Sequence, residues 1–179
     1  MFECIKKLFS KKPVATPTPL PPPEAPKPID PIGAKRNLKK GLDLIKEFEG
    51  CVLHAYPDPG TGGAPWTIGW GHTGSDVYPG KKITQAEADI LFEQDIQPRI
   101  RQVEDLIKVP VNDNQFGALL SFAYNCGVGA LGGSNLLKYL NSGSYDLAAN
   151  QFQFWNRGAN GVLPGLVRRR KAERDLFLS

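Results

Sequence analysis

Nine of the sixteen prolines in this 179-residue chain fall between residues 13 and 31. Proline fixes φ and has no amide hydrogen to donate, so this segment can form neither a helix nor a central strand. It favours an extended polyproline II tether instead. We therefore expect three parts: a short arm over residues 1–12, a Pro-rich linker over 13–36, and one folded domain over 37–179. A domain of that size can bury a sizeable core.

The arm has the pattern of a short basic amphipathic segment. One helical face carries Met1, Phe2, Ile5, Leu8 and Phe9, and the lysines at 6, 7, 11 and 12 lie towards the other side. Twelve residues are marginal for a free helix in water. An anionic bilayer would attract the apolar face and the lysines together. Two interpretations stay open: contact with a membrane or partner, and a disordered basic tail that only aids solubility.

The net charge of +4 belongs entirely to residues 1–36, which hold seven Lys or Arg against three Asp or Glu. Residues 37–179 hold fifteen of each. This balance argues against a nucleic-acid-binding body. No stretch approaches the roughly 18 apolar residues of a membrane span. Cys4, Cys51 and Cys126 show neither metal-ligand nor disulfide spacing. We expect a monomer without cofactor or metal.

The first part of the body combines one helix with short strands. The helix is expected to start at Asn37 as its cap and to run through Phe48, with Gly50 as its stop. Glu49 then stands at the very end of the helix. Residues 51–73 favour strands and turns, because β-rich runs alternate with proline and glycine breakers.

From Thr84 onwards the pattern is helical. Thr84 and Glu87 form a capping box, and Pro98 is expected to kink or break the helix that follows. Four further helices are expected to begin at Asn112, Ser134, Ser144 and Pro164, the last one running to about Leu178. The order of one helix, a small sheet and several helices predicts an α+β fold, with a small strand lobe beside a larger helical lobe.

Two carboxyl groups flank an apolar run in EFEGCVLHAYPDPGTGGAPWTIGWGHTG, residues 47–74. At a helix C-terminus among apolar neighbours, Glu49 should favour its neutral form. Asp58 lies in a Pro-Asp-Pro-Gly turn, where better solvation should keep it ionised. Glycoside hydrolysis uses such a pair of an acid and a base. The hydroxyl of Thr67 could orient a water on the opposite face of the sugar.

The same segment resembles the active-site segment of the phage-type lysozymes of glycoside hydrolase family 24. The resemblance rests on Glu49-Gly50, on Ala55-Tyr56-Pro57-Asp58 and on Trp66-Thr67-Ile68-Gly69-Trp70-Gly71-His72-Thr73. It continues through QFGALLSFAYNCGVGAL at 115–131, Ser134-Asn135-Leu136-Leu137, Trp155 and GVLPGLVRRRKAERDLFL at 161–178. It therefore covers about residues 40–178, in the order of the family.

The resemblance implies a lysozyme-like α+β fold with a cleft between the two lobes, preceded by a disordered Pro-rich arm. It implies an N-acetylmuramidase that cuts the β-1,4 bond between N-acetylmuramic acid and N-acetylglucosamine in peptidoglycan glycan strands. By motif match, Glu49 is the proton donor, Asp58 the second carboxylate and Thr67 the hydroxyl that completes the catalytic triad. We expect phage-induced host lysis, with the protein in the host bacterial cytoplasm before its release to the cell wall. Association with a virion stays open.

The loop from Asp58 to Thr67 is a few residues longer than the compact family pattern. An inverting reaction needs carboxyl groups roughly 6.5–9.5 Å apart and a retaining one about 5 Å, so the longer loop leaves the stereochemical outcome open. Two other functions also stay open. A lytic transglycosylase needs the acid but no attacking water, and a wall-binding or virion module would carry a dead site.

Three residues are candidates for substrate binding: Trp70, His72 and Asn125. We expect His72 to be a hydrogen-bonded support of the site rather than a metal ligand, because no HExxH motif is present. Asn125 is expected to be hydrogen-bonded and to border the cleft. The arginines at 168–170 could attract anionic wall polymer. Packing and ion pairing are favoured for them, including a pair of Arg169 with Glu173 at i, i+4.

Overall fold

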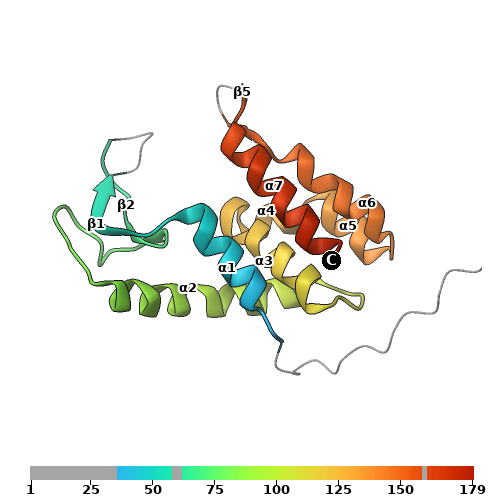
Figure 1. Ribbon diagram of the computed structural model, residues 1–179, viewed down its shortest axis with the longest axis horizontal. Helices are drawn as coiled ribbons and strands as arrows, with labels where there is room; N and C mark the ends of the chain where they lie inside the picture. The colour runs from blue at the N-terminus through green and yellow to red at the C-terminus, as the bar shows by residue number, and fades with distance from the viewer. Residues whose placement is uncertain (1–35, 58–61, 159–160) are drawn as a thin grey trace, which may run out of the picture.

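The computed structural model describes residues 36–57, 62–158 and 161–179. Figure 1 shows a small strand lobe beside a larger helical lobe, and the long helix α2 (Gln85–Leu106) extends along both. This arrangement confirms the predicted α+β fold. None of the helices in the described ranges combines the length and apolarity that a membrane-spanning helix needs. The proposed arm over residues 1–12 and most of the linker lie outside these ranges.

Helix α1 (Lys39–Glu49) leads from the start of the body to the strand lobe. It ends at Glu49 as predicted. The next residue, Gly50, has a φ of 67°, a backbone conformation that residues with a side chain rarely adopt. The predicted cap is wrong by one residue: Leu38 is the cap, although the Asn37 side chain still accepts the Lys39 amide hydrogen. The glycine stop places Glu49 at the junction of the two lobes.

The strand lobe is a three-stranded antiparallel sheet in the order β1-β2-β3. Its strands are β1 (Val52–Pro57), β2 (Trp66–Gly69) and β3 (His72–Thr73). Tyr56 lies opposite Thr67 in the register of the first two strands. Ile68 is fully buried and packs with Ala55 and Val77 in a small separate core. The sheet thus has its own support and fixes Tyr56 and Thr67 side by side.

Helix α2 starts at the predicted capping box, in which the side chains of Thr84 and Glu87 each bond to the other residue's backbone amide. The helix then continues past Pro98 to Leu106, so the proline does not break it. A proline removes a single helical hydrogen bond, and buried residues on both sides of it, such as Ile96 and Val103, hold this helix against the core. Tertiary packing outweighs the local breaker.

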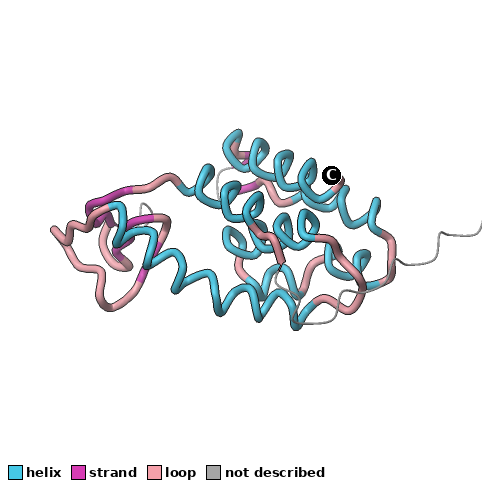
Figure 2. The backbone as a smooth tube through the Cα atoms, turned by 60° about the horizontal axis from the view of Figure 1, so that its bottom comes forward, coloured by secondary structure: helices cyan, strands magenta, loops and turns pink. Residues whose placement is uncertain are grey.

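The helical lobe surrounds α3 (Asp113–Cys126), in which residues 116–123 are all buried. Asn112 caps α3 as predicted, through a capping box with Gln115. The other elements of this lobe are α4 (Val128–Gly132), α5 (Asn135–Asn141), α6 (Tyr145–Gln151), a 3-10 turn (Phe152–Phe154), the hairpin strands β4 (Arg157–Gly158) and β5 (Gly161–Val162), and α7 (Pro164–Phe177). Figure 2 shows these helices gathered at one end of the molecule and the strands of the small sheet at the other. The sequence pattern indicates neither α4 nor the β4–β5 hairpin.

The path of α1 is fixed by a close backbone contact with α3. A Cβ added at Gly41 would lie only 2.5 Å from the Cα of Gly117. Glycine at both positions lets the two helices approach closely, which sets the distance of the end of α1 from α3.

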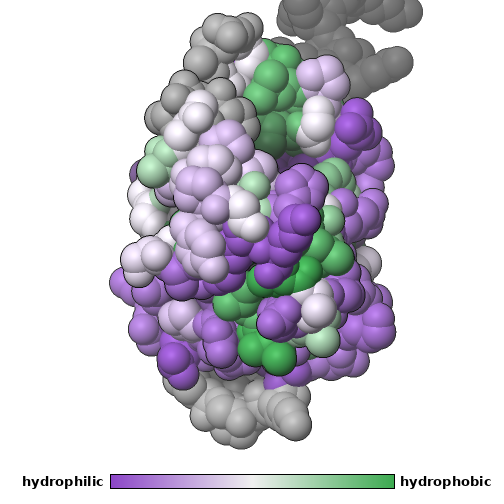
Figure 3. Space-filling model, turned by 90° about the vertical axis from the view of Figure 1, so that its left-hand side faces the viewer, coloured by the Kyte–Doolittle hydropathy of each residue, from purple (hydrophilic) through white to green (hydrophobic). Residues whose placement is uncertain are grey.

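The face in Figure 3 shows hydrophobic patches separated by hydrophilic side chains.

Candidate active site

Glu49 lies where the strand lobe meets the helical lobe. Its side chain is 21% exposed, and its Oε1 accepts a 2.6 Å hydrogen bond from Arg169 Nη1 in α7. Its other oxygen lies above Gly71, where an added Cβ would be 3.4 Å from Oε2. Gly71 has a φ of 91°, so the turn between β2 and β3 needs glycine for its conformation and passes close to the carboxylate.

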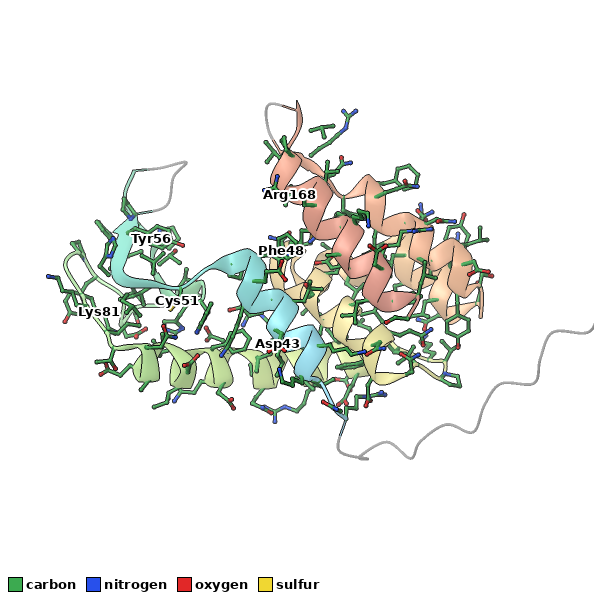
Figure 4. The ribbon with its side chains drawn as sticks, in the orientation of Figure 1. Asp43, Phe48, Cys51, Tyr56, Lys81 and Arg168 are labelled. Carbon is green, nitrogen blue, oxygen red and sulfur yellow. The ribbon has the colours of Figure 1, made fainter. Side chains whose placement is uncertain are left out.

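The strand lobe contributes Tyr56 and Thr67. Figure 4 shows Phe48 at the end of α1 and Tyr56 on the neighbouring strand lobe. Burial raises the pKa of Tyr56, the charge of Glu49 raises it further, and a hydrogen bond with the Thr67 side chain lowers it. Tyr56 thus interacts with both predicted site residues, through the charge of Glu49 and through a hydrogen bond with Thr67. Asp58, the second predicted carboxylate, lies outside the described residues, directly after the end of β1.

Tyr124 in α3 also belongs to the surroundings of Glu49. Its hydroxyl donates a 2.9 Å hydrogen bond to the backbone carbonyl of Trp70, next to Gly71. Burial raises the pKa of Tyr124, Asp95 and Glu49 raise it further, and Arg99 lowers it. Tyr124 is therefore a neutral phenol that anchors the β2–β3 turn beside the carboxylate. Tyr124 is not among the site residues predicted from the sequence; the available signal was its polar hydroxyl within an apolar helical run.

The Trp70 ring packs between the lobes. Its Nε1 donates to Asp89 Oδ1 at 2.9 Å, and Lys46 Nζ lies 5.0 Å from the ring centroid. Lys46 also pairs with Asp89 at 2.7 Å. This Trp70, Lys46 and Asp89 cluster joins the ends of α1, β2 and α2, so a structural role accounts for the interactions of the indole.

His72 is hydrogen-bonded on both sides, as expected of a residue that supports the site. Nδ1 lies 2.9 Å from Asp95 and Nε2 lies 3.2 Å from Asp76. The carboxylate of Asp76 also accepts from Lys81 Nζ at 2.9 Å. Hydrogen bonds from Lys81 and then His72 lower the pKa of Asp76 to about 2. The cluster holds β3 against α2 and the following loop.

The three consecutive arginines of α7, at 168–170, differ in their environments. Arg168 is exposed, whereas Arg169 and Arg170 are buried. The predicted i, i+4 contact of Arg169 with Glu173 is present at 3.2 Å. Asn125 is hydrogen-bonded, also as expected, because its Oδ1 accepts from Arg170 Nη2 at 3.0 Å. Ion pairing and packing therefore account for Arg169 and Arg170, and Arg168 is the exposed member of these three.

A pocket of about 550 Å³ opens on the helical lobe. It is lined by Gly133, Ser134, Asn135, Gln151, Phe154 and Trp155. Neither Glu49 nor Thr67 belongs to this lining, so the pocket is distinct from the predicted acid. Within the described part of the chain, no three His, Cys, Asp or Glu side chains gather in a way that could hold a metal ion.

The sequence of the chain matches a known protein family. The phage lysozyme family model matches residues 46–173. The chain is 48% identical over 139 residues to the endolysin of Bacillus phage B103, across 78% of this chain and 52% of that protein. It is 40% identical over 144 residues to the endolysin of Salmonella phage P22, across 78% of this chain and 95% of that protein. The chain thus spans about half the length of the Bacillus phage endolysins that it matches.

Solved structures agree with the sequence comparison. The muramidase domain of SpmX from Asticaccaulis excentricus matches with a TM-score of 0.74 and 37% identity, over 81% of this chain and 99% of that chain. A P22 lysozyme variant matches with a TM-score of 0.72 and 35% identity, over 82% of this chain and 100% of that chain. Fold, sequence and the matched residues 46–173 together show that the chain belongs to the phage lysozyme family.

Proposed function

We propose that this protein is a peptidoglycan hydrolase that acts in the lysis of a phage-infected bacterial cell. The bond it cleaves is the β-1,4 bond between N-acetylmuramic acid and N-acetylglucosamine. The observation that carries the proposal is Glu49, a carboxyl group at the junction of the lobes in a chain of the phage lysozyme family. The endolysins and the muramidase domain that resemble the chain support the same activity.

In this mechanism Glu49 donates a proton to the leaving sugar oxygen. Asp58 is the second carboxylate and assists the attack of water, a role that rests on its sequence motif. Thr67, next to Tyr56 in the register of the sheet, orients that water. Glycoside hydrolysis needs both steps, because an oxocarbenium-like centre forms while the leaving oxygen takes up its proton.

The products of the reaction test the proposal. Purified peptidoglycan digested by the full chain should yield glycan fragments that end in N-acetylmuramic acid with a free reducing end, detected by mass spectrometry. A lytic transglycosylase would instead yield 1,6-anhydro ends, because the sugar's own hydroxyl attacks in place of water. A wall-binding module would yield neither. Either of the last two results contradicts the proposed hydrolysis.

A matched pair of variants tests the role of Glu49. Glu49→Gln keeps the shape of the side chain but has no proton to donate, so the cleavage rate should fall by about a hundredfold or more. Glu47→Gln is the control, because Glu47 is an exposed glutamate of the same helix. It should cleave at the wild-type rate. Unchanged cleavage by folded Glu49→Gln would refute the assignment of the acid.

A further inference from the structure

The proposed site residues come from the two lobes seen in Figure 1. Glu49 ends α1, and this helix packs on α3 in the helical lobe. Thr67 belongs to β2 in the strand lobe, which has its own small core. A misplacement of about 1 Å can cost roughly a hundredfold in rate. A reaction that uses both side chains therefore depends on how firmly one lobe is held against the other.

The turn between β2 and β3, Trp70–Gly71, lies where the lobes meet. A Cβ added at Gly71 would lie 3.4 Å from Glu49 Oε2 and 3.9 Å from Tyr124 Cε1. The turn thus borders both the proposed acid and a tyrosine of α3. Thr67 lies on the strand that leads directly into the turn. A shift of the turn would therefore also shift the hydroxyl of Thr67.

Tyr124 holds this turn from the helical lobe. Its hydroxyl donates a 2.9 Å hydrogen bond to the backbone carbonyl of Trp70. Its ring contacts two side chains of α2: the Phe92 ring centroid lies 5.8 Å away, and the Arg99 guanidinium lies 4.8 Å from the centroid of the tyrosine ring. Arg99 Nη1 in turn donates to the backbone carbonyl of Asp95 at 2.7 Å. The donor is therefore a side chain whose own position is fixed by packing.

Helix α2 holds the same turn at other atoms. Trp70 Nε1 donates to Asp89 Oδ1 at 2.9 Å. His72, which follows the turn in β3, has its Nδ1 2.9 Å from Asp95 Oδ2. These contacts engage side chains and leave the backbone carbonyl of Trp70 to Tyr124. The hydroxyl of Tyr124 thus connects α3, on which α1 and Glu49 are packed, directly to the strand lobe.

We propose that Tyr124 is a positioning residue for the cleavage reaction: its hydroxyl holds the Trp70–Gly71 turn against the helical lobe and so fixes Thr67 relative to Glu49. This inference rests on the proposed function. The hydroxyl already donates to a backbone carbonyl, so Tyr124 acts through the turn and not on the sugar. Loss of this hydrogen bond should reduce turnover, whereas the binding of the glycan strand should change little.

A substitution that removes only the hydroxyl tests this role. In the full chain acting on soluble peptidoglycan fragments, Tyr124→Phe should lower kcat about tenfold, because Thr67 is held less firmly relative to Glu49. KM should stay within about twofold of the wild-type value. Tyr145→Phe is the matched control, since the Tyr145 hydroxyl also donates to a backbone carbonyl, that of Pro110, at 2.6 Å. Tyr145 lies in α6 of the helical lobe.

The control separates positioning from stability. Each variant loses one phenolic hydrogen bond to a backbone carbonyl, so the midpoint of urea denaturation should fall to a similar extent in both. The loss of turnover should be confined to Tyr124→Phe. A wild-type kcat in folded Tyr124→Phe overturns the proposal, as does an equal fall of kcat in Tyr145→Phe. A raised KM with unchanged kcat also overturns it, because the hydroxyl would then act in substrate binding.

A second variant loosens the same turn from α2. Asp89→Ala removes the acceptor of the Trp70 indole N–H, and the Asp89 side chain is 43% exposed, so the chain should still fold. Its kcat should fall with little change in KM. Asp175→Ala removes an exposed carboxylate that pairs with Lys171 and should match the wild type. If Tyr124→Phe does not fold, a wild-type kcat in Asp89→Ala overturns the proposal.

The position of the turn can also be measured without the reaction. Nitrogen-15 NMR of the full chain should show that the amide resonances of residues 66–73 shift or broaden in Tyr124→Phe and stay unchanged in Tyr145→Phe. Unchanged resonances in both variants would overturn the proposal. A wild-type chain that cleaves no peptidoglycan would instead refute the proposed hydrolase function, and the NMR comparison would still decide whether Tyr124 fixes the turn.

Discussion

Arg169 donates a 2.6 Å hydrogen bond to Glu49 across 120 residues of sequence. The end of α1 is thereby tied to the middle of α7, and both helices pack on α3. The position of the proposed acid thus depends on the C-terminal helix as much as on its own segment. A chain that lacked α7 would have Glu49 without the group that orients it.

The first prediction concerns the stability that depends on Arg169. Arg169→Met leaves Glu173 and Arg170 in the core and removes the partner of Glu49. Breaking a buried ion pair from one side should lower the free energy of unfolding by about 3–5 kcal/mol. Urea denaturation of the full chain measures this change.

The neighbouring Arg168 provides the control for that substitution. Arg168 is exposed, so Arg168→Met should change the free energy of unfolding by no more than about 0.5 kcal/mol. Equal losses in both variants would mean that the contacts of the Arg169 guanidinium contribute little to the fold.

The second prediction concerns the crossing of α1 and α3. Gly41→Ala places a methyl group 2.5 Å from a backbone atom of Gly117, and backbone cannot rotate away as a side chain can. The free energy of unfolding should fall by about 1–3 kcal/mol. The cleavage rate should fall as well, because α1 carries Glu49.

Gly165→Ala is the control: no atom lies within 4 Å of its added Cβ. This substitution in α7 should be neutral or stabilise by up to about 1 kcal/mol. Equal effects of the two substitutions would contradict the crowding at Gly41.

The third prediction is a pH dependence of stability. The pKa of Asp76 is lowered from 3.8 to about 2 in the folded chain by Lys81 and then His72. A lowered pKa in the folded state adds stability above the unfolded value, and this stability is lost as pH falls from about 4 to about 2. The Asp76 side chain is 52% exposed, so solvent limits the contribution to at most about 1 kcal/mol.

Two variants test the origin of that pH dependence. Asp76→Asn should weaken the loss of stability between pH 5 and pH 2, measured by urea denaturation at several pH values. Lys81→Met removes the largest cause of the lowered pKa, so it should have a similar effect. The double variant should differ little from either single variant, since all three remove the same interaction. A wild-type pH dependence in Asp76→Asn would contradict the prediction.

The local features of the fold could be predicted because their causes are local. The capping boxes at Thr84 and Asn112 and the glycine stop after Glu49 each depend on a few adjacent residues. Pro98 shows the limit of such rules, since burial on both sides maintains a helix that the proline alone would interrupt. The short hairpin of β4 and β5 has too few residues to show strand alternation.

The site could be predicted only in part. Glu49 and Thr67 belong to one continuous motif, so their proximity in sequence indicated a shared role. Arg169 and Tyr124 lie at the same site but belong to helices that come much later in the chain: Arg169 donates to Glu49, and Tyr124 donates to the carbonyl of Trp70. Only tertiary packing brings them there, and no spacing rule connects positions so far apart. The pairing of Arg169 with Glu173 was predictable because it spans a single turn of one helix.

The last prediction concerns the arm, which lies outside the described residues and rests on the sequence. Deleting residues 1–31 should leave the cleavage of purified peptidoglycan unchanged, because the body carries every proposed site residue. The same deletion should weaken the sedimentation of the chain with anionic lipid vesicles, since each lysine near such a surface contributes about 1 kcal/mol. Replacing the lysines at 6, 7, 11 and 12 by glutamine should reproduce most of that loss, and added salt should weaken the wild-type binding. Equal sedimentation of the full and shortened chains would remove the membrane role and leave the arm as a solubilising tail.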